Sequence, residues 1–462
     1  MILLKKILIC FLIFFIGLFK LISQENLIVS EINLSGNNIT KDKIIYRELL
    51  FKVGDQILSD ELPDLVEKSR NNLLNTSLFN FVTINHSINR SKIKIEIVFQ
   101  ERWYIWPYPV LEHADRNFSS YLNNEEWSRI DYGLYVLINN FRGRKEILKI
   151  KTIFGFNNRY AITYYKPFID QKQKIGLGFD FNYFKNREIA FQIINNELDY
   201  IKSENDYARR TLELTSFLTY RPRIYVEHLL ALKYNDISVF DTVVALNNNY
   251  FFNHNAEVEF LSLVYNFDLD KRDSKIYPLN GFRLYTTFTK KGIGLLSDRG
   301  PFYLTSIVED NLKLSNRFYF NTSVGFKYSF NDINSFYFSK AIGYDNYIRG
   351  MEYYVSNGSH YYVSKSNLKF ELIPQTNINL DFLASNKFSK AHYAFYLNLF
   401  FDTGYVDSNR NIQTCLSNEF LYSGGLGIDF VTYYDKILRI EYSLNKFGEH
   451  GIFFHLGAPI IE

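Results

Sequence analysis

The residues of this 462-residue chain that could do chemistry are few, and their spacing matches no catalytic pattern. The chain has no HExxH zinc motif, no GxSxG nucleophile turn and no P-loop. The eight histidines are scattered, and they form no identifiable Ser/His/acid trio. The two cysteines, Cys10 and Cys415, cannot build a Cys-rich zinc site or a CxxC redox pair. We therefore expect no enzymatic activity, no catalytic residue, no metal site and no cofactor.

Four charged or glycine-containing motifs in the C-terminal part are better candidates for a functional site. Taken singly, each has an ordinary explanation, such as a charged turn closed by proline and glycine or a loop arginine. In chain order, the motifs are Asp270-x-Arg272-Asp273-x4-Pro278-x-x-Gly281, Tyr347-Ile348-Arg349-Gly350, Phe401-Asp402-x-Gly404, and a run from Gly425-x-Gly427 to Leu438-Arg439-x-Glu441. Their meaning depends on the elements that carry them.

The elements around these motifs are predicted strands, because residues from about 131 to 457 alternate between apolar and polar side chains with period 2. The pattern is clearest in the segments 175–183, 318–330, 422–430 and 438–445. In 393–402 the odd-numbered positions are all apolar, so Asp402 points to the opposite, polar face. An enclosed carboxylate on that face favours a cationic partner, and a bidentate arginine is the strongest option.

Three features favour a membrane barrel over a soluble β-sandwich, which would also alternate. The strands are close to the length of about 9–11 residues that a tilted spanning strand needs. Their apolar faces carry almost no charge, and their polar faces hold charged residues and glycines, which suits a wet lumen. At about 20 residues per strand and connection, the segment gives on the order of 16 antiparallel strands. One apolar window between 132 and 195 is then left over. We expect an all-β transmembrane barrel over 131–462.

Residues 1–23 predict a secretory signal peptide, with Lys5 and Lys6 before an apolar run and Ser23 at its end. An uncleaved anchor is the alternative, but the apolar run is short for a helix of about 20 residues. No later stretch approaches the length of about 18 apolar residues that a spanning helix needs. The composition, 47% hydrophobic and 22% charged, excludes a disordered chain, and the net charge of +3 does not indicate nucleic acid.

Residues 27–100 predict a small α+β domain. In chain order we expect a strand over 27–34, helices over about 40–50 and 60–74, and a hairpin of strands 81–87 and 93–99. Residues 101–130 are expected to form an aromatic linker to the barrel. Its cluster of Trp103, Tyr104, Trp106 and Tyr108 fits a membrane interface, or alternatively packing against the small domain.

The small domain resembles a POTRA domain, the periplasmic module of outer-membrane assembly and secretion barrels. The matching positions are Ile32-x-Leu34-x-Gly36-Asn37, Gly54 between the helices, and Leu78-Phe79-x-x-Val82. The resemblance covers one copy of the domain. A small sheet with an open edge can accept an extended peptide by β-augmentation.

In this order and spacing, the four motifs resemble the BamA/TamA-type outer-membrane protein assembly superfamily, in a short form with one POTRA domain. The resemblance implies a 16-stranded barrel and an extracellular loop that folds into the lumen with a Val-Arg-Gly-aromatic tip. Here the tip reads Ile-Arg-Gly-Met. The resemblance also implies that Arg349 pairs with Asp402. Gly350 and Gly404 would allow the close approach, and Glu371 is a candidate for a second acceptor.

The resemblance implies a biogenesis factor that helps client proteins to enter or cross the bacterial outer membrane, with its N-terminal domain in the periplasm. The expected partners are unfolded outer-membrane or secreted polypeptides and outer-membrane lipid. Accessory lipoproteins stay an open question, and no nucleic acid is expected. The alternatives are a two-partner-type secretion pore for one dedicated client and a passive porin-like barrel. The sequence departs from the family in ending on Ala458-Pro459-Ile460-Ile461-Glu462 and not on an aromatic residue.

Overall fold

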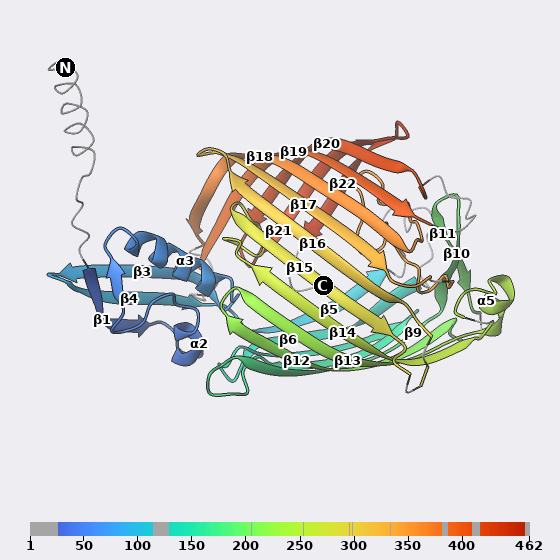
Figure 1. Ribbon diagram of the computed structural model, residues 1–462, viewed down its shortest axis with the longest axis horizontal. Coiled ribbons are helices and arrows are strands. Elements are labelled where there is room, and N and C mark those ends of the chain that lie inside the picture. Colours follow the sequence, from blue (N-terminus) through green and yellow to red (C-terminus); the bar gives the residue numbers. More distant parts are fainter. Residues whose placement is uncertain are drawn as a thin grey trace, which may run out of the picture.

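The computed structural model describes residues 26–113, 129–380, 387–408 and 416–457, apart from the single residues 205, 253, 295, 298 and 333. Across these residues the chain forms a small N-terminal domain beside a large barrel (Figure 1). Among the helices in these ranges, none is both long and apolar enough to cross a membrane. The expected signal peptide over 1–23 and the C-terminal residues 458–462 lie outside the described part of the chain.

The N-terminal domain is a four-stranded sheet packed with two helices. The strands, in the sheet order β2-β1-β4-β3, are β2 (Gln56–Leu58), β1 (Asn26–Ser35), β4 (Lys92–Glu101) and β3 (Phe79–Asn89), with β1 and β4 parallel. The helices are α2 (Asp42–Tyr46) and α3 (Leu62–Leu74). The alternation in β4 buries Ile93, Ile95 and Ile97 against both helices and the other strands. The first helix, α2, is shorter than expected: it ends at Tyr46, whereas the expected helix extended to about residue 50.

The barrel is a single antiparallel sheet of 16 strands, which confirms the predicted fold class. Each strand pairs with its neighbour in the sheet. The strands are β5 (Ile105–His113), β6 (Ile130–Phe141), β7 (Glu146–Gly155), β8 (Asn158–Lys166), β9 (Ile175–Asn186), β12 (Arg209–Arg223), β13 (Val226–Val239), β14 (Glu257–Asp270), β15 (Gly281–Lys291), β16 (Phe302–Lys313), β17 (Phe318–Ser329), β18 (His360–Asn379), β19 (Lys390–Asp407), β20 (Phe420–Thr432), β21 (Lys436–Asn445) and β22 (His450–Gly457).

The barrel begins one strand earlier than the sequence indicated. β5 lies inside the segment 101–130 that was expected to be a linker, and it pairs with β6 over its whole length. Pro107 and Pro109 interrupt its sequence pattern, and proline is found in strands mainly at sheet edges. β5 is such an edge strand. The two prolines are the reason that the sequence pattern did not predict a strand there. The boundary expected at 131 falls within β6.

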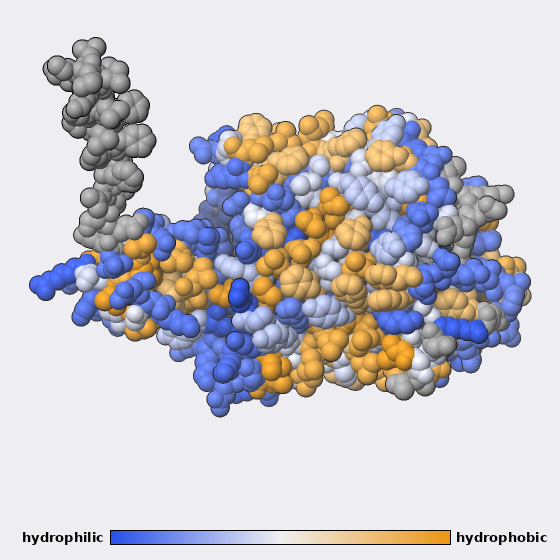
Figure 2. Space-filling model, viewed as in Figure 1, coloured by the Kyte–Doolittle hydropathy of each residue, from blue (hydrophilic) through white to orange (hydrophobic). Residues whose placement is uncertain are grey.

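The barrel turns its apolar side chains outward. On β19 and β20 the exposed residues include Phe401 and Leu426, whereas Asp402 and Asp429 are buried on the inner face. This follows from the period of two along each strand. Figure 2 shows apolar surface spread over the barrel between more hydrophilic ends. The outer surface is therefore suited to lipid and the inner one to polar contacts.

We call the end of the barrel that contacts the N-terminal domain the proximal end, and the opposite one the distal end. At the distal end, the helix α5 (Asp241–Leu246) lies beside a separate hairpin of β10 (Glu188–Ile194) and β11 (Glu197–Lys202) (Figure 1). This hairpin accounts for the apolar window left over between 132 and 195. The distal end has a hydrophobic core of its own. Its aromatic side chains come from the connections β9–β12, β13–β14 and β17–β18 and include Phe191, Tyr250 and Phe338, respectively.

Candidate functional site

The connection between β17 and β18, residues 330–359, packs against the inner wall of the barrel. Four of its buried apolar residues share one cluster with Val363 of β18, Val406 of β19 and Leu421 of β20. The members from the connection are Ala341, Ile342, Ile348 and Met351. Because these side chains anchor the segment, its Arg349-Gly350 tip is held against the polar faces of β19, β20 and β21. We call residues 330–359 the lumenal loop.

Arg349 and Asp402 form a bidentate ion pair inside the barrel. Arg349 Nη2 donates to Asp402 Oδ1 at 2.6 Å, and Nε donates to Oδ2 at 2.9 Å. The backbone N–H of Arg349 also donates to Oδ2, at 3.2 Å. The side chains are only 4% and 0% exposed, respectively. An ion pair as buried as this one is costly to break, because either partner alone would be a buried unpaired charge.

Two further acceptors complete the surroundings of the guanidinium group. Arg349 Nη1 donates to Asn367 Oδ1 at 2.7 Å and to Glu441 Oε1 at 3.0 Å. Glu371, the second acceptor considered from the sequence, lies elsewhere and accepts a hydrogen bond from Tyr396 at 3.4 Å. Its place is taken by Glu441, which stands on β21 in the last of the four motifs.

The glycines at the tip and on β19 permit the close packing of the loop. Gly350 has a φ of 81°, and a Cβ added there would lie 2.7 Å from Ser443 Oγ. A Cβ on Gly404 would lie 2.5 Å from Cδ1 of Ile348. The ring of Phe400 covers the guanidinium carbon of Arg349 at 3.9 Å. Any larger residue at either glycine would push the tip away from the wall.

A chain of polar contacts continues from this site toward the proximal end. Glu441 Oε1 lies 3.8 Å from Arg439 Nε, and Arg439 binds both oxygens of Asp429 at 2.7 and 3.1 Å. Asp429 Oδ2 in turn accepts a hydrogen bond from Tyr277 Oη at 2.7 Å. Tyr277 belongs to the turn between β14 and β15. The lumenal loop and this proximal turn are thus connected through the barrel interior.

The first sequence motif, 270–281, builds that proximal turn. Arg272 pairs with Asp270 at 2.9 Å and with Glu309 of β16 at 2.8 Å. Asp273 Oδ1 accepts a hydrogen bond from the backbone N–H of Leu279 at 3.1 Å, which closes the turn. The motif therefore holds a turn, and the structure does not bring its charged residues to Arg349.

The remaining two positions of the motif shape the same turn. The carbonyl of Pro278 accepts a hydrogen bond from Asn321 Nδ2 at 3.0 Å. Gly281 has a φ of 98°, and a Cβ there would lie 2.3 Å from the carbonyl oxygen of Lys271. Only glycine fits that position without displacing the backbone.

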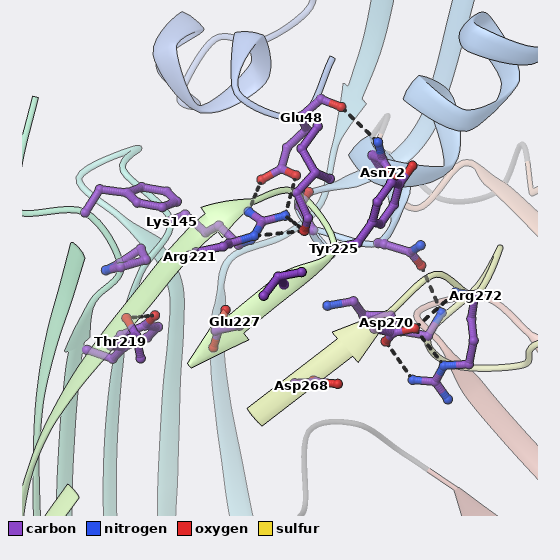
Figure 3. A pocket seen from close by; sticks show the side chains of 18 residues that line it. Glu48, Asn72, Lys145, Thr219, Arg221, Tyr225, Glu227, Asp268, Asp270 and Arg272 are labelled. Carbon is purple, nitrogen blue, oxygen red and sulfur yellow. Dashed lines mark hydrogen bonds and ion pairs between the residues drawn. The ribbon is translucent and has the colours of Figure 1, made fainter. Parts of the chain in front are cut away.

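Buried charges also dock the N-terminal domain on the proximal turns. Glu48 accepts hydrogen bonds from Arg221 at 2.6 and 2.8 Å, and Arg47 donates to the carbonyl of Gln173 at 2.7 Å. Figure 3 shows Glu48 and Arg221 beside a cavity of about 170 Å³ between the domain and the barrel. Burial raises the pKa of Glu48, but the charge of Arg221 outweighs it and lowers that pKa to about 2.

A second group of contacts joins the end of the N-terminal domain to the turn between β20 and β21. Arg102 Nη2 donates to Asp435 Oδ1 at 2.9 Å, and the N–H of Trp103 donates to Tyr434 Oη at 3.1 Å. Trp106 packs its ring on Tyr434. Tyr104 instead joins the core of the N-terminal domain. The aromatic cluster is therefore divided between the domain core and the barrel turn.

Sequence reasoning missed the partners that come from distant elements. Asn367, Asp429 and Glu441 stand on the polar faces of alternating strands, which is the signal that places them inside the barrel. Which inward residues meet depends on how the sheet curls. Glu48 and Arg221 carry no comparable signal, because Glu48 lies in a range expected to be helical and Arg221 lies in the separate segment expected to form the barrel.

The N-terminal domain matches a known family. Residues 27–102 match the POTRA family model, described as a surface antigen variable number repeat. This match confirms the resemblance of the small domain to POTRA. No curated protein sequence is similar to this chain.

Several solved structures are similar to this chain. CdiB from Escherichia coli has a TM-score of 0.55 at 9% identity, over 94% of this chain and 76% of that chain. CdiB from Acinetobacter baumannii has a TM-score of 0.51 at 12% identity, over 94% and 74% of the two chains. A BamA from Haemophilus ducreyi lacking POTRA domains 1–3 has a TM-score of 0.49 at 14% identity, over 93% and 84%. The chain thus combines one POTRA domain with a 16-stranded barrel of the CdiB fold.

Proposed function

We propose that this protein is an outer-membrane biogenesis factor of the BamA/TamA type. Its POTRA domain would bind unfolded client polypeptides, and its barrel would assist their insertion into the outer membrane or their passage across it. The observation that carries the proposal is the architecture, in which a POTRA domain is docked on a 16-stranded barrel sheet that ends on two edge strands. A strand edge offers N–H and C=O groups to an incoming strand, and no covalent chemistry is needed.

The surface of the barrel supports a location in the outer membrane. Its exposed apolar side chains suit contact with outer-membrane lipid, and its inner face is polar. In this arrangement the proximal end and the POTRA domain face the periplasm, where unfolded clients arrive. The lumenal loop, held by Arg349 and Asp402, would then occupy the barrel between rounds of client handling.

Depletion of the protein, followed by a census of outer-membrane and secreted proteins, tests this proposal. We expect the abundance of many barrel proteins to fall. Loss of one secreted protein, with the others unchanged, would instead support a two-partner-type secretion pore. Unchanged levels of all these proteins would contradict the proposed function.

A passive porin is tested separately by deleting residues 27–100. A passive pore needs no periplasmic domain, so its permeability to small solutes should survive the deletion. The proposed function predicts that the deletion variant fails to restore barrel proteins in depleted cells, even where its own barrel folds.

A further inference from the structure

Three lysines line a cavity of about 330 Å³ inside the barrel, toward its distal end. Lys291 is the last residue of β15, Lys327 stands near the distal end of β17, and Lys340 belongs to the lumenal loop. The wall of the cavity consists mainly of odd-numbered residues of β15 and β16, and residues between 337 and 346 of the loop close one side. The cavity therefore lies between the loop and strands that the Arg349 site does not touch.

The lysines on the strands point into the barrel, because side chains alternate between its two faces. On β17, Lys327 is only 6% exposed, whereas its neighbour Tyr328 is 51% exposed on the outer face. On β15 the same alternation buries Thr289 and exposes Phe288, so Lys291 shares the inner face with Thr289. A lysine directed inward needs acceptors there, since an ammonium group carries three donors and no acceptor.

The described part of the chain supplies few acceptors for these ammonium groups. Lys327 Nζ donates one hydrogen bond, to the carbonyl of Lys340 at 2.9 Å. Within the described residues, none of the three lysines forms an ion pair with a carboxylate. Aromatic rings lie near instead: Lys291 Nζ is 5.0 Å from the ring centre of Phe338, and Lys327 Nζ is 5.1 Å from that of Tyr303. A ring attracts a cation, but it does not cancel its charge.

The charges around the cavity do not balance. Asp345 is the only carboxylate among the described residues that line it, so the three lysines leave an excess of two positive charges. Outside the lining, Lys233 is already paired with Glu213 at 3.0 Å, and Arg209 adds a further positive charge that acts on Lys340. Like charges held close together repel, and an anion placed between them relieves that repulsion.

We propose that this cavity binds a phosphate-bearing anion dissolved in the water of the lumen. A phosphomonoester carries a charge of about −1.5 to −2 at pH 7 and three strong acceptor oxygens, which match the excess charge and the three lysines. The cavity volume is at the lower end of the range of about 300–1,000 Å³ that small-molecule sites occupy. Because its wall belongs to the inner face, a lipid headgroup on the outer face would not reach it.

Binding there attaches the lumenal loop to the barrel wall at a second place. Lys340 stands on the loop, whereas Lys291 and Lys327 stand on β15 and β17, so an anion that contacts all three joins the loop to both strands. The Arg349 site holds the loop tip to other strands, β18, β19 and β21. The anion therefore stabilises the loop inside the barrel, whatever the barrel transports.

Limited proteolysis of the purified full-length protein in a non-ionic detergent tests the proposal, with inorganic phosphate as the probe. Sodium phosphate is compared with sodium chloride at equal ionic strength and pH 7, and equilibrium dialysis with labelled phosphate measures the stoichiometry and the Kd. We expect one phosphate per chain. At a phosphate concentration tenfold above the Kd, the lumenal loop should be cleaved about tenfold more slowly than in chloride, since the anion binds only while the loop is inside.

Substitutions of the loop lysine test the role of its charge. Lys340→Gln should weaken phosphate binding about tenfold, because a charged hydrogen bond is lost. Lys340 is exposed, so this change leaves the packing of the loop intact. Lys340→Arg keeps the charge and should bind phosphate within about threefold of the unmodified protein. Lys172→Gln, in the exposed connection between β8 and β9, changes the net charge equally and should leave phosphate binding unchanged.

A gain of binding gives a test that misfolding does not imitate. Asp345 is exposed on the loop and lines the cavity. Asp345→Asn removes a negative charge that repels the anion, and it should tighten phosphate binding about fivefold.

The results that would overturn the proposal are specific. Equal cleavage of the loop in phosphate and in chloride would do so, and so would phosphate binding that Lys340→Gln and Asp345→Asn both leave unchanged. In phosphatidylcholine liposomes, protection of the loop by added phosphatidic acid but not by inorganic phosphate would assign the lysines to a lipid headgroup and contradict a dissolved anion. No client polypeptide enters these measurements, so their result is independent of the proposed function.

Discussion

Two of the buried arginine–carboxylate pairs in the described part of the chain differ in what they connect. Arg349 and Asp402 join the lumenal loop to the wall of the same barrel, whereas Arg221 and Glu48 join the barrel to the POTRA domain. The two carboxylate side chains are 0% and 2% exposed. The first pair fixes a segment inside one domain, and the second fixes the position of one domain on another.

The surroundings of the two pairs indicate different strengths. The guanidinium group of Arg349 is also bound by Asn367 and Glu441, so three strands hold it. The pair of Arg221 and Glu48 instead borders a cavity between the domains. Packing on all sides makes the loop contact hard to release, whereas the domain contact can separate without opening a void in the barrel. We expect the loop to be the firmer of the two attachments.

The largest expected effect comes from breaking the loop contact. Arg349→Ala and Asp402→Ala should each abolish function, because each leaves a buried charge that costs about 3–5 kcal/mol. The double variant should add little further damage. Complementation of depleted cells and proteolysis of the lumenal loop measure both effects. Arg317→Ala, in an exposed turn, is the matched control, and additive effects of the two site variants would contradict the contact.

A somewhat smaller effect is expected at the domain contact. Arg221→Ala or Glu48→Gln should undock the POTRA domain at a cost of about 3 kcal/mol and leave the barrel folded. Spin labels at the exposed Lys68 and Lys172 would report a broadened distance distribution. Lys233→Ala disrupts a more exposed pair with Glu213 and should leave the distribution narrow. A narrow distribution in the Arg221 and Glu48 variants would show that the pair does not hold the domain.

The identity of the second acceptor gives a sharper test of the loop site. Glu441→Gln weakens a charged contact to Arg349 and should loosen the loop by about 1–2 kcal/mol. Glu371→Gln should have no effect on the loop, because Glu371 contacts Tyr396. Equal protease sensitivity of the loop in the two variants would argue against the observed arrangement.

The smallest effect is the pH dependence of domain docking. The pKa of Glu48 falls from 4.5 to about 2 in the docked state. The ionised Glu48 therefore stabilises docking fully well above pH 4.5, and this stabilisation is lost as the pH falls toward 2. Between pH 7 and pH 4, docking should weaken by only about 1 kcal/mol. Distance measurements over this range should show a slight broadening in the unmodified protein, whereas the distribution of Glu48→Gln, already broad at pH 7, should not change with pH.

The sequence was sufficient for the barrel strands after β5 and for the direction of Asp402, because both depend on local alternation. It was also sufficient for the core of the N-terminal domain, where Ile93, Ile95 and Ile97 share one face. β5 was missed because two prolines are atypical of strands in general, although they suit an edge. The edge position itself depends on the whole sheet.

The partners of the arginines could not be predicted for a related reason. Glu441 and Asn367 reach Arg349 from strands far apart in the sequence, and only the curl of the barrel sheet brings them together. Glu48 meets Arg221 across an interface between domains, where no periodic pattern extends from one chain segment to the other. Local patterns therefore indicate which residues point inward, but they do not indicate which of those residues meet.

The most direct test of the central claim is in-cell photo-crosslinking from the edge strand β3 of the POTRA domain. A photoreactive residue in place of the exposed Asn85 or Ser87 would sample the sheet edge, and one in place of Lys68 on α3 would serve as the control. The account predicts that newly exported outer-membrane or secreted proteins are captured from β3 and not from α3. Equal capture from both positions, or no capture of such proteins from either, would contradict it.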